Sequence, residues 1–267
     1  MFARYHVKRA AGRIPVLDIR KIIAATCDAI AETLYPTRCV GCDDPGTLLC
    51  PSCENALPRI DLKIACPRCG APFGAQLCTE CPPPGATDTA GRLLPPPFSF
   101  DAARCATSYE GVAKQLVSAY KDGNEQRLAA HIADEICRVI AAELSWVAAA
   151  DLLVPVPPTP SHLRLRGWNP LGEVADLIAK QLSLPLAEAL VSAKAKDQRK
   201  LDRATRAANR SGSIFVKPEF GEFMSQAPTI VVLDDVLTTG ATCNAAAQAL
   251  KGAGAARVFV ATYARVW

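Results

Sequence analysis

One short run near the carboxyl end of the chain constrains its fold more than any other feature. Residues 229–233 are apolar and indicate a buried strand, Asp234 and Asp235 follow directly, and residues 238–242 (TTGAT) begin a helical pattern. Backbone N–H groups in a turn and at a helix N-terminus bind anions, and Gly240 lets the backbone approach a ligand closely. Two adjacent carboxylates repel a phosphate but accept hydrogen bonds from sugar hydroxyls. The run therefore predicts a sugar-phosphate site, with an ordinary strand–turn–helix as the alternative.

The chain from residue 101 onward alternates strand patterns with helical patterns. Strands are expected at 102–109, 151–156, 229–233 and 257–264, and helices at 111–120, 127–144, 169–182 and 241–253. This alternation is typical of an α/β fold, in which helices cover both faces of a parallel sheet. The sequence contains no GxxxxGK[ST] run, which argues against a P-loop nucleotide-binding protein.

The ordered run of apolar strand, acidic pair, two apolar residues and TTGxT resembles the phosphoribosyl-diphosphate (PRPP) motif of type I phosphoribosyltransferases. The resemblance implies a core of five mostly parallel strands with flanking helices, beneath a variable hood. It places Asp234 and Asp235 where that family holds the ribose 2′- and 3′-hydroxyls, and Thr238, Thr239, Gly240 and Thr242 in the 5′-phosphate loop. The implied PRPP-binding segment comprises Asp234, Asp235, Val236, Leu237, Thr238, Thr239, Gly240, Ala241 and Thr242.

A second ligand-binding loop is expected at the same edge of the sheet. The strand pattern at 151–156 stops at two prolines, and α/β sheets bind ligands at the carboxyl ends of their strands. Two arginines follow, and their planar guanidinium groups suit pyrophosphate oxygens. The sequence thus predicts a pyrophosphate site formed by Pro157, Pro158, Thr159, Arg164 and Arg166. A solvated basic turn is the alternative interpretation of the two arginines.

Eight of the twelve cysteines form CxxC pairs in one short region. They are Cys39, Cys42, Cys50, Cys53, Cys66, Cys69, Cys78 and Cys81. Two CxxC turns supply the four thiolates of a tetrahedral zinc site, so one or two structural Zn²⁺ ions are predicted. Metal binding then supplies much of the folding free energy of so small a module. An iron–sulfur cluster and redox or structural thiols are the alternatives. Sequential pairing, which gives two zinc ribbons, and first-with-third pairing, which gives a cross-brace, both remain open.

Composition divides the chain into four parts. These are a basic leader at 1–33, the zinc-binding CxxC module at 34–82, a proline-rich linker at 83–100 and a phosphoribosyltransferase-like domain at 101–267. The leader has charges throughout and does not resemble a signal peptide. The most apolar later stretch, 139–156, contains Glu143 and Asp151 and is broken by Pro155, so no membrane insertion is expected. We therefore expect a cytoplasmic protein, a compartment in which CxxC pairs favour metal ligation over disulfides.

Residues 194–210 are strongly basic, with seven Lys and Arg against two Asp. This segment suits either a flexible lid that contacts an anionic ligand or a strip that contacts nucleic acid. A solvated surface is the third interpretation. The segment contains no aromatic residue, which argues against a platform that stacks bases.

Segments 154–169, 198–215 and 230–242, together with the N-terminal cysteine module, resemble the ComF family, which is associated with natural competence and DNA uptake. The resemblance extends from about residue 34 to residue 263 and departs from the family's pattern at Pro170, where Gln is expected. It implies that PRPP binds with Mg²⁺ and that a nitrogen nucleophile displaces pyrophosphate from C1 of the ribose. No side chain needs to act as a nucleophile in such a transfer, so no catalytic residue is predicted.

Three functions remain open at this level. The first is a phosphoribosyltransferase, a glycosyltransferase that moves a pentosyl group to an unspecified acceptor. The second is a non-catalytic competence factor that binds single-stranded DNA, and the third is a regulator that senses PRPP without turnover. The partners implied are PRPP, single-stranded DNA and proteins of the competence machinery.

Overall fold

The computed structural model describes residues 36–74, 77–79, 81–83, 85–92, 98–192 and 214–267. The predicted leader at 1–33 and the basic segment at 194–210 lie outside these residues, as do parts of the predicted linker. Among the described residues, no helix combines the length and the apolar character that a membrane span requires.

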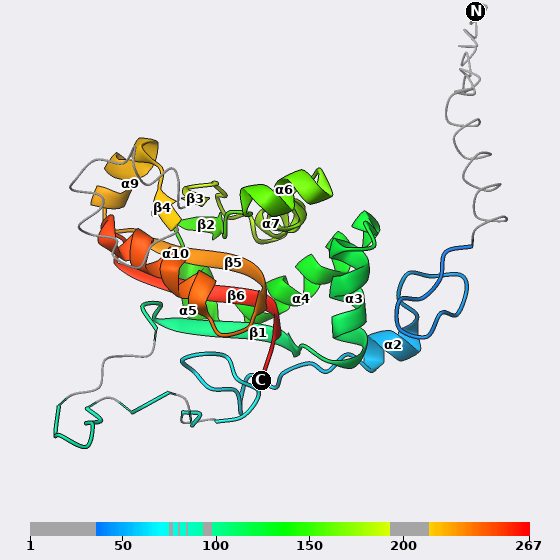
Figure 1. Ribbon diagram of the computed structural model, residues 1–267, viewed down its shortest axis with the longest axis horizontal. Helices are drawn as coiled ribbons and strands as arrows, with labels where there is room; N and C mark the ends of the chain where they lie inside the picture. The colour runs from blue at the N-terminus through cyan, green and yellow to red at the C-terminus, as the bar shows by residue number, and fades with distance from the viewer. Residues whose placement is uncertain (1–35, 75–76, 80, 84, 93–97, 193–213) are drawn as a thin grey trace, which may run out of the picture.

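Four parallel strands form the central sheet (Figure 1). In spatial order they are β1 (Ala102–Ser108), β6 (Arg257–Arg265), β5 (Thr229–Leu237) and β2 (Leu152–Pro155). All of β2 and the first five residues of β5 are buried, as expected for strands of a parallel sheet with helices on both faces. The resemblance implied five strands. Beyond β2, a single parallel bridge between Leu153 and Leu186 takes the place of a fifth strand, so the described sheet has four.

Helices cover both faces of this sheet. On one side, α4 (Ala129–Ala142) packs on β1 and β6 and against α7 (Pro170–Leu182), which also contacts β2 and β5. On the other side, α10 (Ala241–Gly252) packs on β5 and β6. The connection from β1 to β2 and the connection from β5 to β6 cross the sheet in opposite directions. Because crossovers between parallel strands are right-handed, the helices of these two connections lie on opposite faces.

Shorter elements complete the fold. They are α2 (Pro51–Asn55), α3 (Gly111–Lys121), η1 (Gln126–Leu128), α5 (Leu144–Ala149), α6 (Pro160–Arg166), η3 (Pro218–Phe220), α9 (Gly221–Ser225) and an antiparallel pair of β3 (Leu190–Ser192) with β4 (Ile214–Val216). The sequence pattern did not predict α6. Pro170 occupies the first turn of α7, where a proline costs no backbone hydrogen bond, so the departure from the family's pattern fits the local structure.

Strand β5 is longer than its apolar run indicates. The pattern predicts a strand at 229–233, but β5 continues to Leu237 because its backbone pairs with β6 as far as the Leu237–Arg265 position. The acidic pair therefore lies within the strand rather than in the turn after it. Tertiary pairing overrides the local polar residues, whose side chains remain only partly buried.

The cysteine module packs against the open edge of the sheet. The backbone of its Arg59 forms an antiparallel β-bridge with Thr107 of β1, and the Ile60 N–H donates to the Ala106 carbonyl at 2.9 Å. Cys39, Cys53 and Leu57 belong to the same buried cluster as the strands. The module thus covers backbone groups that an edge strand would otherwise leave unpaired.

Candidate functional site

The eight CxxC cysteines form two separate four-cysteine clusters. One contains Cys39, Cys42, Cys50 and Cys53, the other contains Cys66, Cys69, Cys78 and Cys81, and within each the sulfur atoms lie within 4.8 Å of one another. The pairing is therefore sequential, as in two zinc ribbons, and the cross-brace is excluded. Four sulfur ligands leave no open coordination position, which fits structural zinc.

Backbone N–H groups donate hydrogen bonds to the first sulfur of each cluster and favour its thiolate form. The Cys50 N–H donates to Cys39 Sγ at 3.3 Å, and the Cys78 N–H donates to Cys66 Sγ at 3.5 Å. Burial opposes ionisation, but these and neighbouring N–H donors outweigh it. They lower the pKa of Cys39 to about 6 and that of Cys66 to about 7. Thiolates are the form that binds zinc, so Cys39 and Cys66 are readily ionised ligands, whereas the pKa values of Cys42, Cys53, Cys69 and Cys81 are raised in the metal-free clusters.

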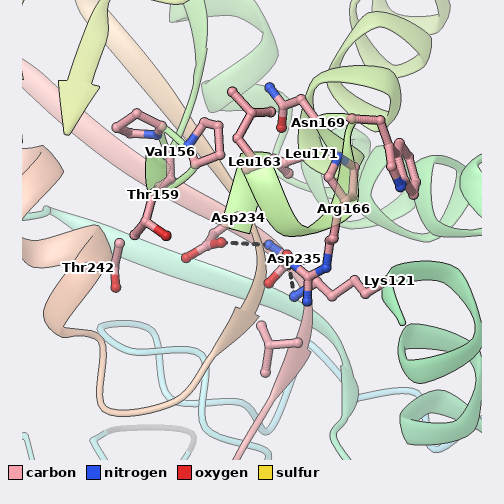
Figure 2. A pocket seen from close by; sticks show the side chains of 15 residues that line it. Lys121, Val156, Thr159, Leu163, Arg166, Asn169, Leu171, Asp234, Asp235 and Thr242 are labelled. Atoms are coloured by element: carbon pink, nitrogen blue, oxygen red, sulfur yellow. Dashed lines mark hydrogen bonds and ion pairs between the residues drawn. The ribbon is translucent and has the colours of Figure 1, made fainter. Parts of the chain in front are cut away.

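A polar cavity of about 300 Å³ opens where β2 and β5 end (Figure 2). Its position is the carboxyl edge of the parallel sheet, where this class of fold binds ligands. Carboxylates from β5, prolines after β2, and cations from α3 and α6 converge on it. Its lining is Lys121, Val156, Pro157, Pro158, Thr159, Leu163, Arg166, Trp168, Asn169, Pro170, Leu171, Asp234, Asp235, Val236 and Thr242.

The acidic pair provides the negative side of this cavity. The Asp235 N–H donates to Asp234 Oδ1 at 2.9 Å, and the Cys243 thiol donates to Asp234 Oδ2 at 3.3 Å. Burial first, and then the charge of Asp235, raise the pKa of Asp234 to about 7. The Lys121 ammonium pairs with the Asp235 carboxylate. Near neutral pH, Asp234 is therefore divided between its protonated and ionised forms. The neighbouring Asp235 carboxylate forms an ion pair with Lys121.

The predicted phosphate loop follows β5 and leads into α10. Gly240 directly precedes this helix with φ +76°, a left-handed conformation that favours glycine. Thr238, Thr239 and Thr242 are exposed, and Thr242 lines the cavity. Behind the loop, the guanidinium of buried Arg265 donates to the carbonyls of Leu237, at 3.1 Å, and Thr238. At the start of α10 the Ala241 N–H donates to Thr239 Oγ1 at 3.4 Å, whereas the N–H groups of Thr242 and Cys243 have no acceptor within the helix and suit an anion.

The predicted pyrophosphate residues divide into two groups. Pro157, Pro158 and Thr159 line the cavity together with Arg166, whose guanidinium pairs with Asp122 at 2.9 Å. Arg164 is exposed on the same short helix and is not among the lining residues. The two arginines are two positions apart on a helix and so point in different directions.

Lys121 and Trp168 line the cavity but were not predicted from the sequence. Lys121 is the last residue of α3, and its position beside the acidic pair depends on packing between α3 and α7. Tyr120 provides that packing, because its hydroxyl donates to the Pro170 carbonyl at 2.7 Å and its ring lies edge-on to Trp168. No local pattern marks these residues, since the contact joins segments distant in sequence.

Comparisons with known proteins match the cysteine module and, separately, most of the chain. Residues 30–82 match a family model described as a double zinc ribbon domain. A protein of Bacillus subtilis (strain 168), described as competence protein ComFC, is 28% identical over 242 residues, which cover 89% of this chain and 92% of that protein. The match therefore spans the cysteine module and the sheet domain together.

Proposed function

Because this chain belongs to the ComF family, we propose that its sheet domain binds PRPP together with Mg²⁺ in the cavity between β2 and β5. The observation that carries the proposal is the convergence of three groups on one cavity. These are the acidic pair, the start of α10 and the cations Lys121 and Arg166. Each matches a different part of PRPP.

Each group has a separate task in this proposal. The carboxylates of Asp234 and Asp235 accept hydrogen bonds from the ribose 2′- and 3′-hydroxyls. Backbone N–H groups of residues 238–242 and the Thr242 hydroxyl hold the 5′-phosphate. The pyrophosphate lies by Thr159, with Lys121 and Arg166 as its cationic partners.

A transfer reaction follows from this arrangement. A nitrogen atom of the acceptor forms a bond to C1 as the bond from C1 to the pyrophosphate oxygen breaks, and pyrophosphate leaves with the electron pair. Mg²⁺ bound with PRPP would supply positive charge to the pyrophosphate, and the oxygen atoms of the polar cavity suit this hard cation. The protein contributes positioning and the two cations, which stabilise the leaving group. We assign no side chain as a nucleophile, and the acceptor remains open.

The proposal also includes a cytoplasmic role in natural competence and DNA uptake, supported by the match to competence protein ComFC over most of the chain. Single-stranded DNA and proteins of the competence machinery are the partners of that role. Non-catalytic DNA binding is therefore the second candidate function, and PRPP sensing without turnover is the third. A labelled single-stranded oligonucleotide, titrated at two salt concentrations, tests DNA binding through its salt dependence. Affinity that ignores salt and persists after removal of residues 1–95 would argue against the second candidate.

Calorimetric titration of PRPP with Mg²⁺ tests the principal proposal. We expect saturable binding by the wild type and loss of most of that affinity in the double variant Asp234→Asn with Asp235→Asn. Asp176→Asn is the matched control, because this exposed carboxylate lies on α7 outside the cavity lining. Undetectable binding by the wild type, or equal affinity of all three proteins, would refute PRPP binding. Pyrophosphate release in the presence of candidate acceptors then separates an enzyme from a sensor.

A further inference from the structure

The second four-cysteine site (Cys66, Cys69, Cys78 and Cys81) lies close to the phosphate loop (residues 238–242), and Phe98 joins the two. The Phe98 side chain packs against the buried cysteines of this site. The same ring also packs against Gly240, because a Cβ atom added at Gly240 would lie 2.8 Å from Phe98 Cε1. One aromatic ring thus contacts both the metal-binding module and the residue that directly precedes α10.

Hydrogen bonds fix the backbone of Phe98 from both sides. Arg68, within the Cys66–Cys69 turn, donates from Nη2 to the Phe98 carbonyl at 3.1 Å. The next residue, Ser99, donates its N–H to Asn244 Oδ1 of α10 at 2.6 Å. The CxxC turn is itself attached to β1, since the Ala103 N–H donates to the Arg68 carbonyl at 3.0 Å. The second site and the helix after the phosphate loop therefore hold the same short segment.

A second route reaches the other end of the loop through the C-terminus. Phe73, between the two CxxC turns of the second site, lies edge-on to Trp267 with ring centroids 5.0 Å apart. The Arg265 guanidinium lies over the Trp267 ring at 5.4 Å. The same guanidinium donates to the carbonyls of Leu237 and Thr238, where β5 passes into the loop. Both ends of the loop thus have a chain of contacts to the second four-cysteine site.

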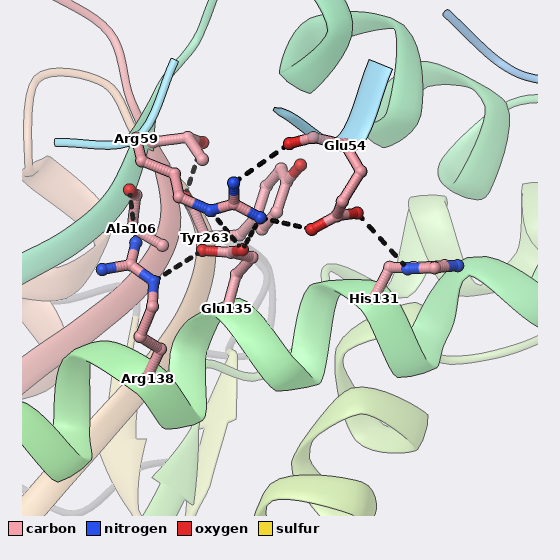
Figure 3. A network of polar contacts seen from close by, with 8 residues as sticks. Glu54, Arg59, Ala106, His131, Glu135, Arg138 and Tyr263 are labelled. Atoms are coloured by element: carbon pink, nitrogen blue, oxygen red, sulfur yellow. Dashed lines mark hydrogen bonds and ion pairs between the residues drawn. The ribbon is translucent and has the colours of Figure 1, made fainter. Parts of the chain in front are cut away.

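The first four-cysteine site (Cys39, Cys42, Cys50 and Cys53) has different neighbours. Glu54 and Arg59, which follow its last CxxC turn, form a polar network with α4 (Figure 3). Arg59 Nε donates to Glu135 at 2.7 Å, and Arg138 Nε donates to the same carboxylate at 2.9 Å. In the described part of the chain this network lies on α4 and not at the phosphate loop. The two four-cysteine sites therefore have separable structural effects.

We propose that metal binding at the second four-cysteine site orders the phosphate loop, with Phe98 as the positioning residue. Without bound metal, the turns that hold Phe98 and Phe73 lose the cross-link that fixes them. The loop then loses the ring that packs on Gly240 and part of the support for Arg265. An anion must then order the loop on binding, so its affinity falls. This consequence for affinity rests on the proposed PRPP function, whereas the ordering of the loop does not.

Hydrogen–deuterium exchange of amides in residues 237–244 tests the ordering directly, without any ligand. The zinc-bound wild type is compared with Cys69→Ser plus Cys78→Ser, and with Cys42→Ser plus Cys50→Ser as the matched control at the first site. We expect exchange in this segment to rise about tenfold or more in the second-site variant and to stay unchanged in the control. Unchanged exchange in the second-site variant, or an equal rise in both variants, overturns the proposal.

Phe98→Ala tests the same idea in a protein that retains all eight cysteines. We expect Phe98→Ala to bind as much zinc as the wild type and to exchange faster in residues 237–244. The conservative variant Phe98→Leu should exchange at the wild-type rate. Wild-type exchange in Phe98→Ala with full zinc content overturns the positioning role. This variant decides the question if the cysteine variants fail to fold.

Calorimetry with Mg²⁺ and PRPP on the same proteins separates this proposal from the proposed function. If the wild type binds PRPP, Phe98→Ala should bind it more weakly, and equal affinity contradicts the link to binding. If the wild type does not bind PRPP, the proposed function fails while the exchange data still decide whether the second four-cysteine site orders the loop.

Discussion

At the scale of single residues, Asp234 should leave a signature in the pH dependence of stability. Its pKa is raised from 3.8 to about 7 in the folded protein, so between these values the folded state keeps a proton that the unfolded state has lost. The contribution of Asp234 to stability is therefore full below pH 3.8 and is lost as pH rises through about 7. Asp234→Asn removes this titration.

Denaturant unfolding of the wild type and Asp234→Asn across pH 4 to 8 measures this effect. We expect the variant to gain stability relative to the wild type as pH rises, with the difference levelling off above about pH 7. A difference that does not change with pH would contradict the raised pKa of Asp234.

The two arginines of α6 form a matched pair for mutagenesis. Arg166 lines the cavity, whereas Arg164 is exposed and is not among the lining residues. Arg166→Gln should weaken the binding of Mg²⁺ and PRPP about tenfold, because a charge-assisted partner of the pyrophosphate is lost. Arg164→Gln should bind like the wild type. Equal effects of the two substitutions in calorimetry would show that α6 contributes only diffuse positive charge.

The residues of the candidate site differ in how far the sequence can predict them. Asp234, Asp235 and Gly240 can be predicted because they lie on one continuous strand–turn–helix, where spacing fixes geometry. Lys121 cannot be predicted, because its position beside Asp235 depends on how α3 packs on α7 through Tyr120 and Pro170. The sequence also treats Arg164 and Arg166 alike, since only the orientation of α6 distinguishes them.

At the scale of elements, Gly240 decides how α10 begins. Its φ is +76°, and an added Cβ would approach the Phe98 ring to 2.8 Å. Gly240→Ala should therefore lower the free energy of unfolding by about 1–3 kcal/mol and weaken anion binding at the helix N-terminus. Thermal or denaturant unfolding measures the first effect.

Gly252→Ala provides the control on the same helix. Gly252 ends α10, and an added Cβ there would meet no atom within 4 Å. Ala has the higher helix propensity, so this substitution should leave the protein as stable as the wild type or stabilise it by about 0.5–1 kcal/mol. Equal destabilisation at the two glycines would contradict a special role for Gly240.

The sequence predicts the elements of the sheet domain better than their ends. The periodicity identifies α7 and α10 closely, because a helix with one buried face has a strong repeat. The length of β5 is underestimated, because Asp234, Asp235 and Val236 are only partly buried and are held in the strand by pairing with β6. The fifth strand of the implied sheet is reduced to one bridge at Leu186, which no residue pattern indicates.

At the scale of the whole molecule, a polar network joins the cysteine module to α4 (Figure 3). Glu135 is buried at its centre and accepts hydrogen bonds from Arg59 and Arg138. Glu135→Gln keeps the shape but removes the charge that both guanidinium groups face. We expect a loss of about 1–3 kcal/mol in the free energy of unfolding, because the buried charge that both guanidinium groups face is removed. Water screens the partly exposed arginines, which limits the loss.

Urea denaturation followed by two probes measures this loss, with Arg92→Gln as the control. Arg92 pairs with Asp88 on the surface and is 80% exposed, so its substitution should not move the denaturation midpoint. A midpoint in Glu135→Gln equal to that of the wild type would show that the network does not stabilise the contact between the module and α4.

The sequence predicts the content of the two parts of the molecule but not how they fit together. CxxC spacing indicates metal sites, and the structure resolves their pairing into two sequential four-cysteine sites. Nothing in the spacing indicates that Arg59 pairs with β1 or that Phe98 packs on Gly240. The division of the chain at residues 33, 82 and 100 stays a prediction, and the basic segment 194–210 lies outside the described residues.

A crystal structure of the protein with Mg²⁺ and PRPP tests the central claim most directly. We predict the 5′-phosphate against the N–H groups of residues 238–242, the ribose hydroxyls at Asp234 and Asp235, and the pyrophosphate beside Lys121 and Arg166. Density for PRPP elsewhere on the molecule would contradict the account. So would a cavity without ligand at a PRPP concentration that saturates binding in solution.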